Sequence, residues 1–263
     1  RNDKQFELIS PSISNFNNTI ISPNFNIEIL NPKDCSRFCG LIIDNIKVKD
    51  SPEFIQNRLK AIGLNPINNI VDITNYVMHE IGQPLHAYDR AKIKSNTIRI
   101  KKINTKNKFT ILDGKEIDLN EDDLMICDED SPMCLAGVYG GLNYSVTSET
   151  KTIFLESASF NPISIRKSSK THSLNTDSSY RFERGVDIEN TEFALKRAAA
   201  LIIEHCDGDI VSDIMDEFPG KIDEKNIVLN FDNVDSLIGF KIDRLKIKSI
   251  LNLLDFKINN VTV

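Results

Sequence analysis

The stretch IRIKKINTKNKFTILDGKEID, residues 98–118, sets the character of the fold. It opens at 98–100 with an apolar–charged alternation, which is typical of a half-buried strand. Two short segments, Thr110-Ile111-Leu112 and Glu116-Ile117, flank Asp113-Gly114, a dipeptide that favours a tight hairpin turn. The segment therefore predicts short strands joined by a turn.

Neighbouring segments continue this pattern on both sides. Short apolar runs at 124–127 and 153–155 predict further strands, and so does the longer run at 38–46. The run at 71–78 is apolar with a polar insert, and it precedes a turn at Gly82-Gln83-Pro84. We therefore expect a strand at 38–46 and a strand-rich centre between residues 98 and 155.

Two helices are indicated outside this centre. Ser51 and Pro52 predict a helix start, with serine as the N-cap and proline at the first helical position, and Gly63 ends that helix. Residues 188–206 give the clearest helical pattern, with Gly208 just after its end. The chain thus mixes helices with short strands.

Composition changes mark the domain limits. Residues 1–36 are rich in Asn, Ser and Pro and predict a linker or irregular arm. Pro219-Gly220 marks a boundary, after which residues 222–263 predict a small, incomplete second domain. Its expected elements are a strand at 227–231, a helix ending at Gly239 and a helix at 243–254. A first residue that is not methionine suggests a piece of a longer protein.

The charge and cysteine content exclude some classes of protein. The 263 residues carry a formal net charge of −6, which argues against a general phosphate-binding clamp. The five cysteines form no C-x-x-C pair and are expected to be buried, reduced thiols of a cytoplasmic protein. No long apolar run or signal peptide is present, so no membrane association is expected.

Three familiar catalytic motifs fail on inspection. His79-Glu80 resembles the start of a zinc-protease helix, but Gln83 stands where the second histidine is required. The glycines at 137–141 lack the spacing of a dinucleotide-binding loop. No G-x-S-x-G sequence supports a serine hydrolase. Taken singly, His86 fits a structural histidine and Glu156 a solvated strand end.

Five motifs acquire a different meaning when they are taken together. They are VDITNYV (71–77), GQPLHAYD (82–89), LDG (112–114), GVYGG (137–141) and TDSSYRFERGVD (176–187). In this order they resemble the tRNA-editing module of bacterial phenylalanyl-tRNA synthetase beta subunits. The resemblance covers residues 37–219, and residues 222–263 are more loosely similar to the start of the next module.

This resemblance implies an α+β fold with a β-sandwich-like core, followed by a small truncated second domain. It also implies a heterotetrameric, cytoplasmic ligase in which an alpha subunit carries ATP- and magnesium-dependent aminoacylation. This fragment would need no cofactor or metal of its own. Its partners would be the acceptor end of tRNA(Phe) and the alpha subunit, and its activity would be hydrolysis of tyrosine wrongly attached to that tRNA.

The family's site residues transfer onto matching positions of this chain. In a catalytic role the resemblance places His86, Thr176 and Asn75. In the substrate pocket it places Glu156, Thr74, Gly137, Gly140 and Ser178. Glu156 would accept a hydrogen bond from the tyrosine phenol, and phenylalanine would leave that carboxylate unpaired. His86 would orient a water or the terminal adenosine, and the two glycines would admit the ligand close to the backbone.

One position departs from the family pattern. Ser178 stands where many members have alanine, and its hydroxyl could narrow the pocket or add a polar contact. The alternative function is a non-catalytic module that positions tRNA or partner subunits, and a weaker alternative is an unrelated hydrolase or metal enzyme. Retention of His86, Glu156 and Thr176 favours editing over the scaffold function.

Overall fold

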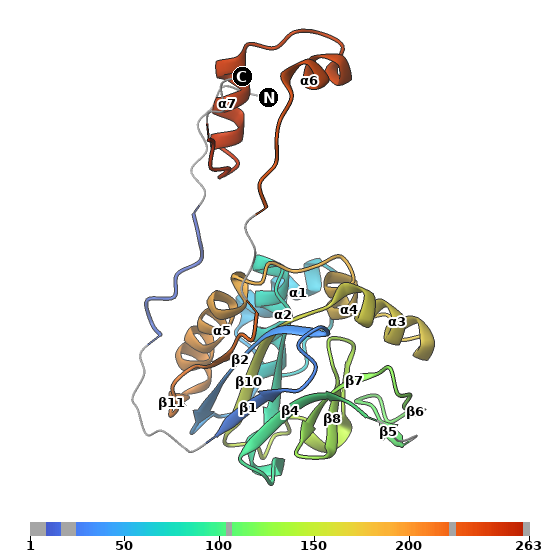
Figure 1. Ribbon diagram of the computed structural model, residues 1–263. Helices are drawn as coiled ribbons and strands as arrows, with labels where there is room; N and C mark the ends of the chain where they lie inside the picture. Colours follow the sequence, from blue (N-terminus) through green and yellow to red (C-terminus); the bar gives the residue numbers. More distant parts are fainter. Residues whose placement is uncertain (1–8, 17–24, 104–106, 221–224, 260–263) are drawn as a thin grey trace. The chain divides into compact units, whose positions relative to one another are not determined.

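The computed structural model describes four stretches of the chain, residues 9–16, 25–103, 107–220 and 225–259 (Figure 1). The chain divides into two compact units, residues 1–221 and 222–263, and each is described by itself. Much of the predicted arm at 1–36 and the two ends of the second unit lie outside the described residues.

One sheet carries the predicted acid and the predicted histidine. Its strands are β2 (Cys35–Asp44), β3 (Leu85–Asp89), β10 (Ile153–Phe160), β11 (Asp209–Ile210) and β12 (Met215–Glu217). They run in the order β11-β2-β10-β3, β12 also pairs with β2, and every pairing is antiparallel. The runs predicted at 38–46 and 153–155 fall in β2 and β10.

A second sheet is formed mainly by strands of the predicted strand-rich centre. Its strands, in spatial order, are β1 (Asn26–Ile29), β4 (Thr97–Lys102), β7 (Leu124–Asp128), β8 (Ser131–Leu135) and β9 (Tyr139–Gly140). The predicted hairpin is confirmed as β5 (Lys108–Thr110) and β6 (Glu116–Asp118), with Gly114 at a φ of 85° in the turn. Strand β1 lies inside the predicted arm and pairs in parallel with β4, so the arm ends earlier than residue 36.

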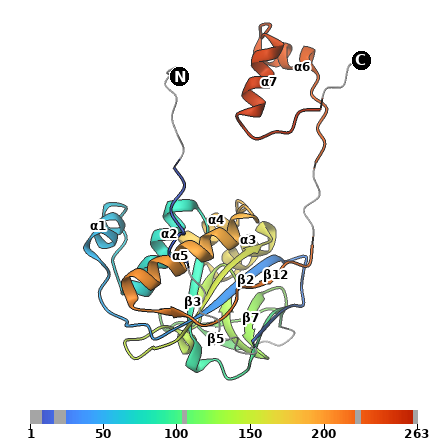
Figure 2. The same cartoon turned by 90° about the vertical axis from the view of Figure 1, so that its left-hand side faces the viewer.

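The two sheets pack face to face, and helices cover the outer face of the first sheet. Phe38, Tyr88 and Phe154 belong to the apolar core between the sheets, together with Met125 and Leu135. The outer layer consists of α1 (Glu53–Ala61), α2 (Asn69–Ile81) and α5 (Asn190–Cys206), as Figure 2 shows. This arrangement confirms the predicted α+β fold with a sandwich core.

Alternation along β10 decides where the acid points. Leu155 packs into the core beneath the helices, whereas Phe154 packs between the two sheets. Side chains two residues apart share a face of a strand, so Glu156 also points between the sheets. Gly40 on β2 lacks a side chain that would collide with the Phe154 ring, where an added Cβ would lie 2.3 Å from Cζ.

Helix α2 accounts for the ambiguous run at 71–78. The Asn68 side chain caps its start by accepting hydrogen bonds from the backbone N–H groups of Ile70 and Val71, and Gly82 ends it in the left-handed conformation. The prediction that Ser51 caps α1 is wrong. Pro52 occupies the N-cap position, and the Ser51 hydroxyl instead donates to the carboxylate of Asp72 on α2.

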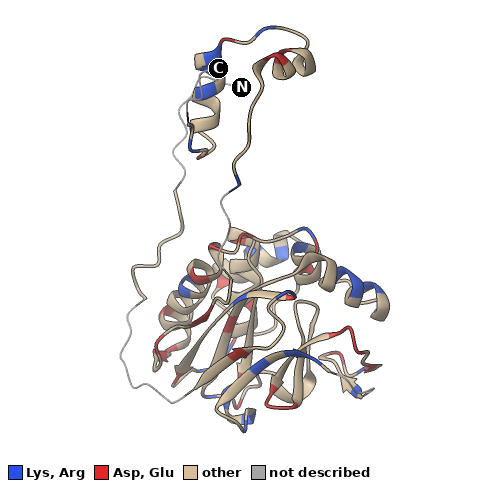
Figure 3. Ribbon diagram, in the orientation of Figure 1, with Lys and Arg blue, Asp and Glu red and all other residues tan. Residues whose placement is uncertain are grey.

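Two short helices follow β10. The first is α3 (Pro162–His172), capped by Asn161, and the second is α4 (Asp177–Phe182), capped by Thr176. In Figure 3 the ribbon of these helices carries the blue that marks Lys and Arg positions. Residues 162–184 contain five basic residues and two acidic ones, although the net charge of the whole chain is negative. The basic residues are Arg166, Lys167, Lys170, Arg181 and Arg184.

The second unit contains α6 (Phe231–Ile238) and α7 (Arg244–Asn252). Both helices were predicted, but the strand predicted at 227–231 is wrong. Residues 225–230 form no regular element, and within the described part of this unit no strand is present to supply the hydrogen bonds that a strand requires. Across all described residues, no helix has the length and apolar character to cross a bilayer.

Candidate functional site

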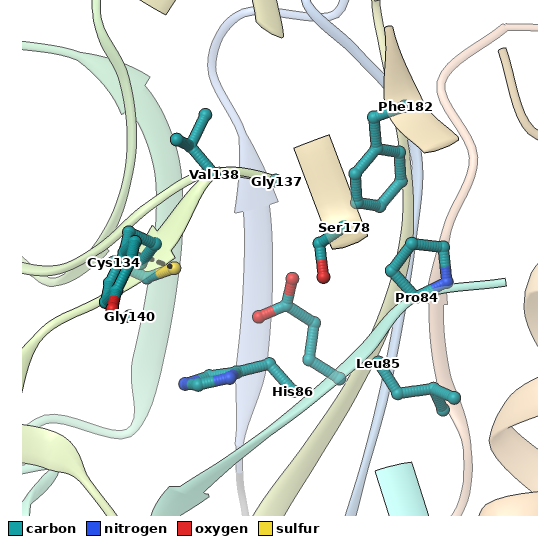
Figure 4. Close-up of a pocket in the computed structure, with 11 residues that line it drawn as sticks. Pro84, Leu85, His86, Cys134, Gly137, Val138, Gly140, Ser178 and Phe182 are labelled. Atoms are coloured by element: carbon teal, nitrogen blue, oxygen red, sulfur yellow. Dashed lines mark hydrogen bonds between the residues drawn. The ribbon is translucent and has the colours of Figure 1, made fainter. Parts of the chain in front are cut away.

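A cavity opens between the two sheets at α4 (Figure 4). The empty space at this site, part of it open to solvent, is about 360 Å³, and its walls come from β3 and the turn before it, the β8–β9 segment, β10 and α4. Figure 4 shows Ser178 and Phe182 on one side of the hollow and Cys134 and Gly140 on the other. The lining residues are Pro84, Leu85, His86, Cys134, Gly137, Val138, Tyr139, Gly140, Glu156, Ser178 and Phe182.

The sheet register brings His86 and Glu156 together. They are directly opposite each other in the antiparallel pair of β3 and β10, so both side chains leave the same face. The turn before β3 is held by Gln83, which is fully buried and donates from Nε2 to the Ala158 carbonyl oxygen at 2.7 Å. This anchor fixes the start of the strand that carries the histidine.

Glu156 is a buried acid with one hydrogen-bond donor. Glu156 is 5% exposed, and the Tyr88 hydroxyl donates a hydrogen bond to its Oε2 at 2.5 Å. Burial raises the pKa of Glu156 to about 8, and the hydrogen bond from Tyr88 opposes part of that rise. The carboxyl group therefore carries a proton through most of the neutral range.

His86 is held as a neutral ring. Burial lowers the pKa of His86 to about 4, although part of the residue still faces the cavity. Its ring packs edge-to-face against Tyr88, with ring centroids 4.6 Å apart. A neutral imidazole offers one N–H donor and one acceptor nitrogen, which suits it to orient a water molecule.

The two predicted glycines make room for protein side chains. An added Cβ at Gly140 would lie 2.9 Å from Nε2 of His86, and one at Gly137 would lie 2.9 Å from Cδ2 of Phe182. Gly137 also has a φ of 67°, which disfavours any other residue. Both glycines line the cavity, but the space they leave is filled by His86 and Phe182 rather than left open for a ligand.

Helix α4 supplies Ser178 to the cavity and uses Thr176 as a structural anchor. The Thr176 hydroxyl donates to the Val138 carbonyl oxygen at 3.0 Å and accepts from the Ser179 backbone N–H at 3.0 Å. Thr176 therefore joins α4 to the segment that contains Gly137, without lining the cavity. The Ser178 hydroxyl contacts Sδ of Met78 at 3.7 Å.

Thr74 and Asn75 lie on α2, outside the cavity wall. Thr74 is buried and donates from its hydroxyl to the Val71 carbonyl oxygen at 2.7 Å, and Asn75 is half-buried. Thr74 is one helical turn from Met78, the residue that contacts Ser178. The structure thus gathers five of the eight predicted residues in the cavity and leaves Thr74, Asn75 and Thr176 around it.

Two further residues belong to the site but were not predicted. Tyr88 contacts both Glu156 and His86, and it follows His86 by two positions, so strand alternation placed it on the same face. Cys134 lines the cavity, and burial raises the pKa of its thiol well above the usual range. All five cysteines are free and buried, as expected. The described residues contain no group of three His, Cys, Asp or Glu side chains that could hold a metal ion.

Similar proteins extend over most of the chain. The phenylalanine-tRNA ligase beta subunit of Porphyromonas gingivalis is 46% identical over 260 residues, which is 98% of this chain and 32% of that protein. The corresponding subunit of Carboxydothermus hydrogenoformans is 42% identical over 233 residues, 89% of this chain and 29% of that protein. The chain spans about a third of the length of these relatives.

A solved structure has the same fold. An N-terminal fragment of the phenylalanyl-tRNA synthetase beta subunit from Pyrococcus horikoshii matches 89% of this chain and 65% of its own, with a TM-score of 0.51 and 14% identity. The family model described as the B3/4 domain matches residues 34–207, which include every residue of the cavity and all strands of the two sheets except β1, β11 and β12. The chain therefore belongs to the B3/4 domain family.

Proposed function

We propose that the cavity hydrolyses the ester bond of tyrosyl-tRNA(Phe) and so removes mischarged tyrosine. The observation that carries this proposal is the buried Glu156, which faces a cavity beside His86 and accepts a hydrogen bond from a phenol of the protein itself. Membership of the B3/4 family and similarity to phenylalanine-tRNA ligase beta subunits support it.

Selection against phenylalanine follows from the burial of Glu156. A tyrosine phenol can hydrogen-bond to the carboxyl group in either protonation state, because the group accepts when ionised and both donates and accepts when protonated. Phenylalanine would bury the same carboxyl against an aromatic ring with no hydrogen-bond partner besides Tyr88, which costs free energy. A site built to bind a hydroxyl discriminates far better than an apolar pocket that merely tolerates one.

His86 would position the water rather than act as a strong base. A pKa of about 4 leaves the ring neutral at pH 7 but makes it a weak proton acceptor. One ring nitrogen can accept a hydrogen bond from water and so direct the water at the ester carbonyl. Thr176 and Gly137 would contribute by fixing the wall formed by α4 and the β8–β9 segment.

The basic helices beside the cavity suit the acceptor end of a tRNA. Helix α4 contributes Ser178 to the lining, and residues 162–184, which include α3 and α4, contain five basic and two acidic residues. We propose that these helices contact the phosphates of the tRNA(Phe) acceptor end. We also propose that the parent protein is the beta subunit of a cytoplasmic ligase that works with an alpha subunit, and that ATP and magnesium serve parts of that ligase outside this chain.

The decisive experiment measures deacylation of tyrosyl-tRNA(Phe) and phenylalanyl-tRNA(Phe) by the complete ligase. The unmutated enzyme should prefer the tyrosyl ester, and Glu156→Ala should reduce that preference by about tenfold or more, since a buried hydrogen bond is lost. Glu204→Ala, on the outer helix α5, is the matched control and should leave the preference intact. Equal cleavage of both esters by the unmutated enzyme would contradict the proposal and favour a scaffold role.

A further inference from the structure

Tyr88 is the buried neighbour of both proposed site residues. It is completely buried, its hydroxyl donates to Oε2 of Glu156 at 2.5 Å, and its ring packs against His86. A buried tyrosine hydroxyl needs a hydrogen-bond partner, and this acid supplies it. Tyr88 therefore connects the acid and the histidine across the two strands that carry them.

The two oxygens of Glu156 have different surroundings. Oε2 is held by Tyr88, whereas no group in the described part of the chain donates to Oε1. Three polar side-chain atoms of the described residues are fully buried and lack a hydrogen-bond partner: His79 Nε2, Gln83 Oε1 and Ser157 Oγ. Glu156 Oε1 is not one of them, although no described residue donates to it, so it is not fully buried. Since Glu156 lines the cavity, Oε1 is the oxygen that a bound molecule can reach.

We propose that Tyr88 is a positioning residue that holds Oε2 of Glu156 so that Oε1 presents itself to the hydroxyl of a bound tyrosyl group. This inference rests on the proposed editing function. The phenol of Tyr88 is the same chemical group as that of the substrate, so the carboxyl already accommodates one phenol at hydrogen-bond distance. A carboxyl fixed by an internal donor also loses little conformational freedom when the second phenol binds.

Tyr88 also tunes the protonation of the acid. Its hydrogen bond lowers the pKa of Glu156 against the larger effect of burial, which raises it. The other titratable groups around the acid are His86 on β3, Cys134 on β8 and Cys35 on β2. Burial keeps all three neutral at pH 7, because it lowers the pKa of the histidine and raises the pKa of both thiols. Loss of the Tyr88 hydroxyl should therefore move the titration of Glu156 to higher pH.

The test is Tyr88→Phe in the complete ligase, with kcat and KM measured for deacylation of both esters of tRNA(Phe). We expect the preference for the tyrosyl ester to fall about two- to tenfold, which is the range of a neutral hydrogen bond. The loss should appear mainly as a higher KM for the tyrosyl ester, with the phenylalanyl ester unaffected. Tyr76→Phe is the matched control, because its hydroxyl bonds Glu80 in the outer helix layer.

Two readouts separate positioning from mere packing. The pH midpoint of the tyrosyl preference should rise in Tyr88→Phe and stay constant in Tyr76→Phe. An unchanged or stronger preference in a folded Tyr88→Phe enzyme would overturn the inference, since the hydroxyl would then be idle or would compete with substrate. Failure of the unmutated ligase to prefer the tyrosyl ester would instead refute the proposed function.

A second measurement needs no substitution at Tyr88. Fluorotyrosine can replace the five tyrosines of the chain, and the ¹⁹F signal of Tyr88 can be assigned by changing the other four to phenylalanine. Tyrosine amide, at a concentration that inhibits deacylation, should shift this signal, whereas phenylalanine amide should not. An identical response to both amides, or no response to either, would overturn the inference.

Discussion

At the scale of single residues, burial shifts the pKa values of Glu156 and His86 in opposite directions. It raises the pKa of the acid to about 8 and lowers that of the histidine to about 4, so both side chains are neutral near pH 6. A charge on either one would be enclosed by the cavity walls, and this is the common cause of both shifts. A neutral lining can both donate and accept hydrogen bonds without first expelling a counterion.

These shifts make stability depend on pH in a defined window. In the unfolded chain the carboxyl ionises near pH 4.5, so between pH 4.5 and 8 the folded state binds more protons and stability falls as pH rises. The histidine acts in the opposite sense below its ordinary pKa of 6.5, where the unfolded state binds more protons. The two effects oppose each other below pH 6.5, and Glu156 acts alone from there to pH 8.

Glu156→Gln should remove the alkaline part of this dependence. Each pH unit in the window is worth about 1.4 kcal/mol, so the unmutated chain should lose about 2 kcal/mol more than the variant between pH 6.5 and 8. Urea unfolding at the two pH values measures the difference. Parallel behaviour of variant and unmutated chain would show that Glu156 is ionised in the folded state, and Glu204→Gln serves as the exposed control.

The sequence allowed some residues of the candidate site to be predicted, but not the role of every residue. His86 could be predicted because it lies in a specific motif, and Glu156 because it matches a family position; the structure brings both into the cavity. The role expected for the glycines was different, because the sequence cannot show that the Phe182 and His86 side chains fill the space beside them. Tyr88 was overlooked although its spacing from His86 placed it on the same face.

At the scale of elements, α4 is a wall of the cavity that depends on its cap. The Thr176 hydroxyl makes two contacts, one to the Ser179 backbone N–H of the helix and one to the Val138 carbonyl oxygen of the facing segment. A helix of six residues has little stability of its own, so these contacts determine where Ser178 lies. Thr176 would thus serve the proposed editing site by positioning α4, without contacting the substrate.

Thr176→Val should therefore weaken both stability and deacylation, whereas Thr176→Ser should restore both. Loss of the cap and of the contact to Val138 should cost about 1–2 kcal/mol of unfolding free energy, because each is a partly buried hydrogen bond. Serine retains the hydroxyl and with it both contacts. Urea unfolding and the deacylation rate of each variant provide the measurements. Full stability of Thr176→Val with lost deacylation would instead indicate a direct catalytic role.

The elements that the sequence predicted correctly are those with local signals. The hairpin at Asp113-Gly114 carries a turn signal, and the helix of residues 190–206 carries a periodicity signal within its own sequence. Strand β1 and the capping role of Ser51 depend on distant partners, Thr97–Lys102 in one case and Asp72 in the other. No local pattern encodes such contacts, so the sequence analysis missed β1 and gave Ser51 the wrong role.

At the scale of the whole first unit, an ion pair between a buried arginine and a partly exposed aspartate joins its beginning to its end. Arg37 on β2 is 5% exposed and binds Asp216 on β12 through two hydrogen bonds, Nε to Oδ1 at 2.9 Å and Nη2 to Oδ2 at 2.7 Å. The pair spans 179 positions and lies on the sheet that carries the cavity. Asp216 also accepts from the Cys39 thiol, so it serves three donors on β2.

Asp216→Asn should destabilise the first unit far more than the loss of an exposed pair. The guanidinium of Arg37 would stay buried with only the more distant Glu189 and Glu192 to neutralise it, at an expected cost of about 2–3 kcal/mol. Glu116→Gln breaks the exposed pair with Lys108 and should cost less than about 1 kcal/mol. Urea unfolding at neutral pH compares the two variants. Equal and small losses of unfolding free energy in the two variants would contradict this expectation. They would mean that the backbone pairing with β2 alone holds β12, and that the ion pair sets the register without stabilising the sheet.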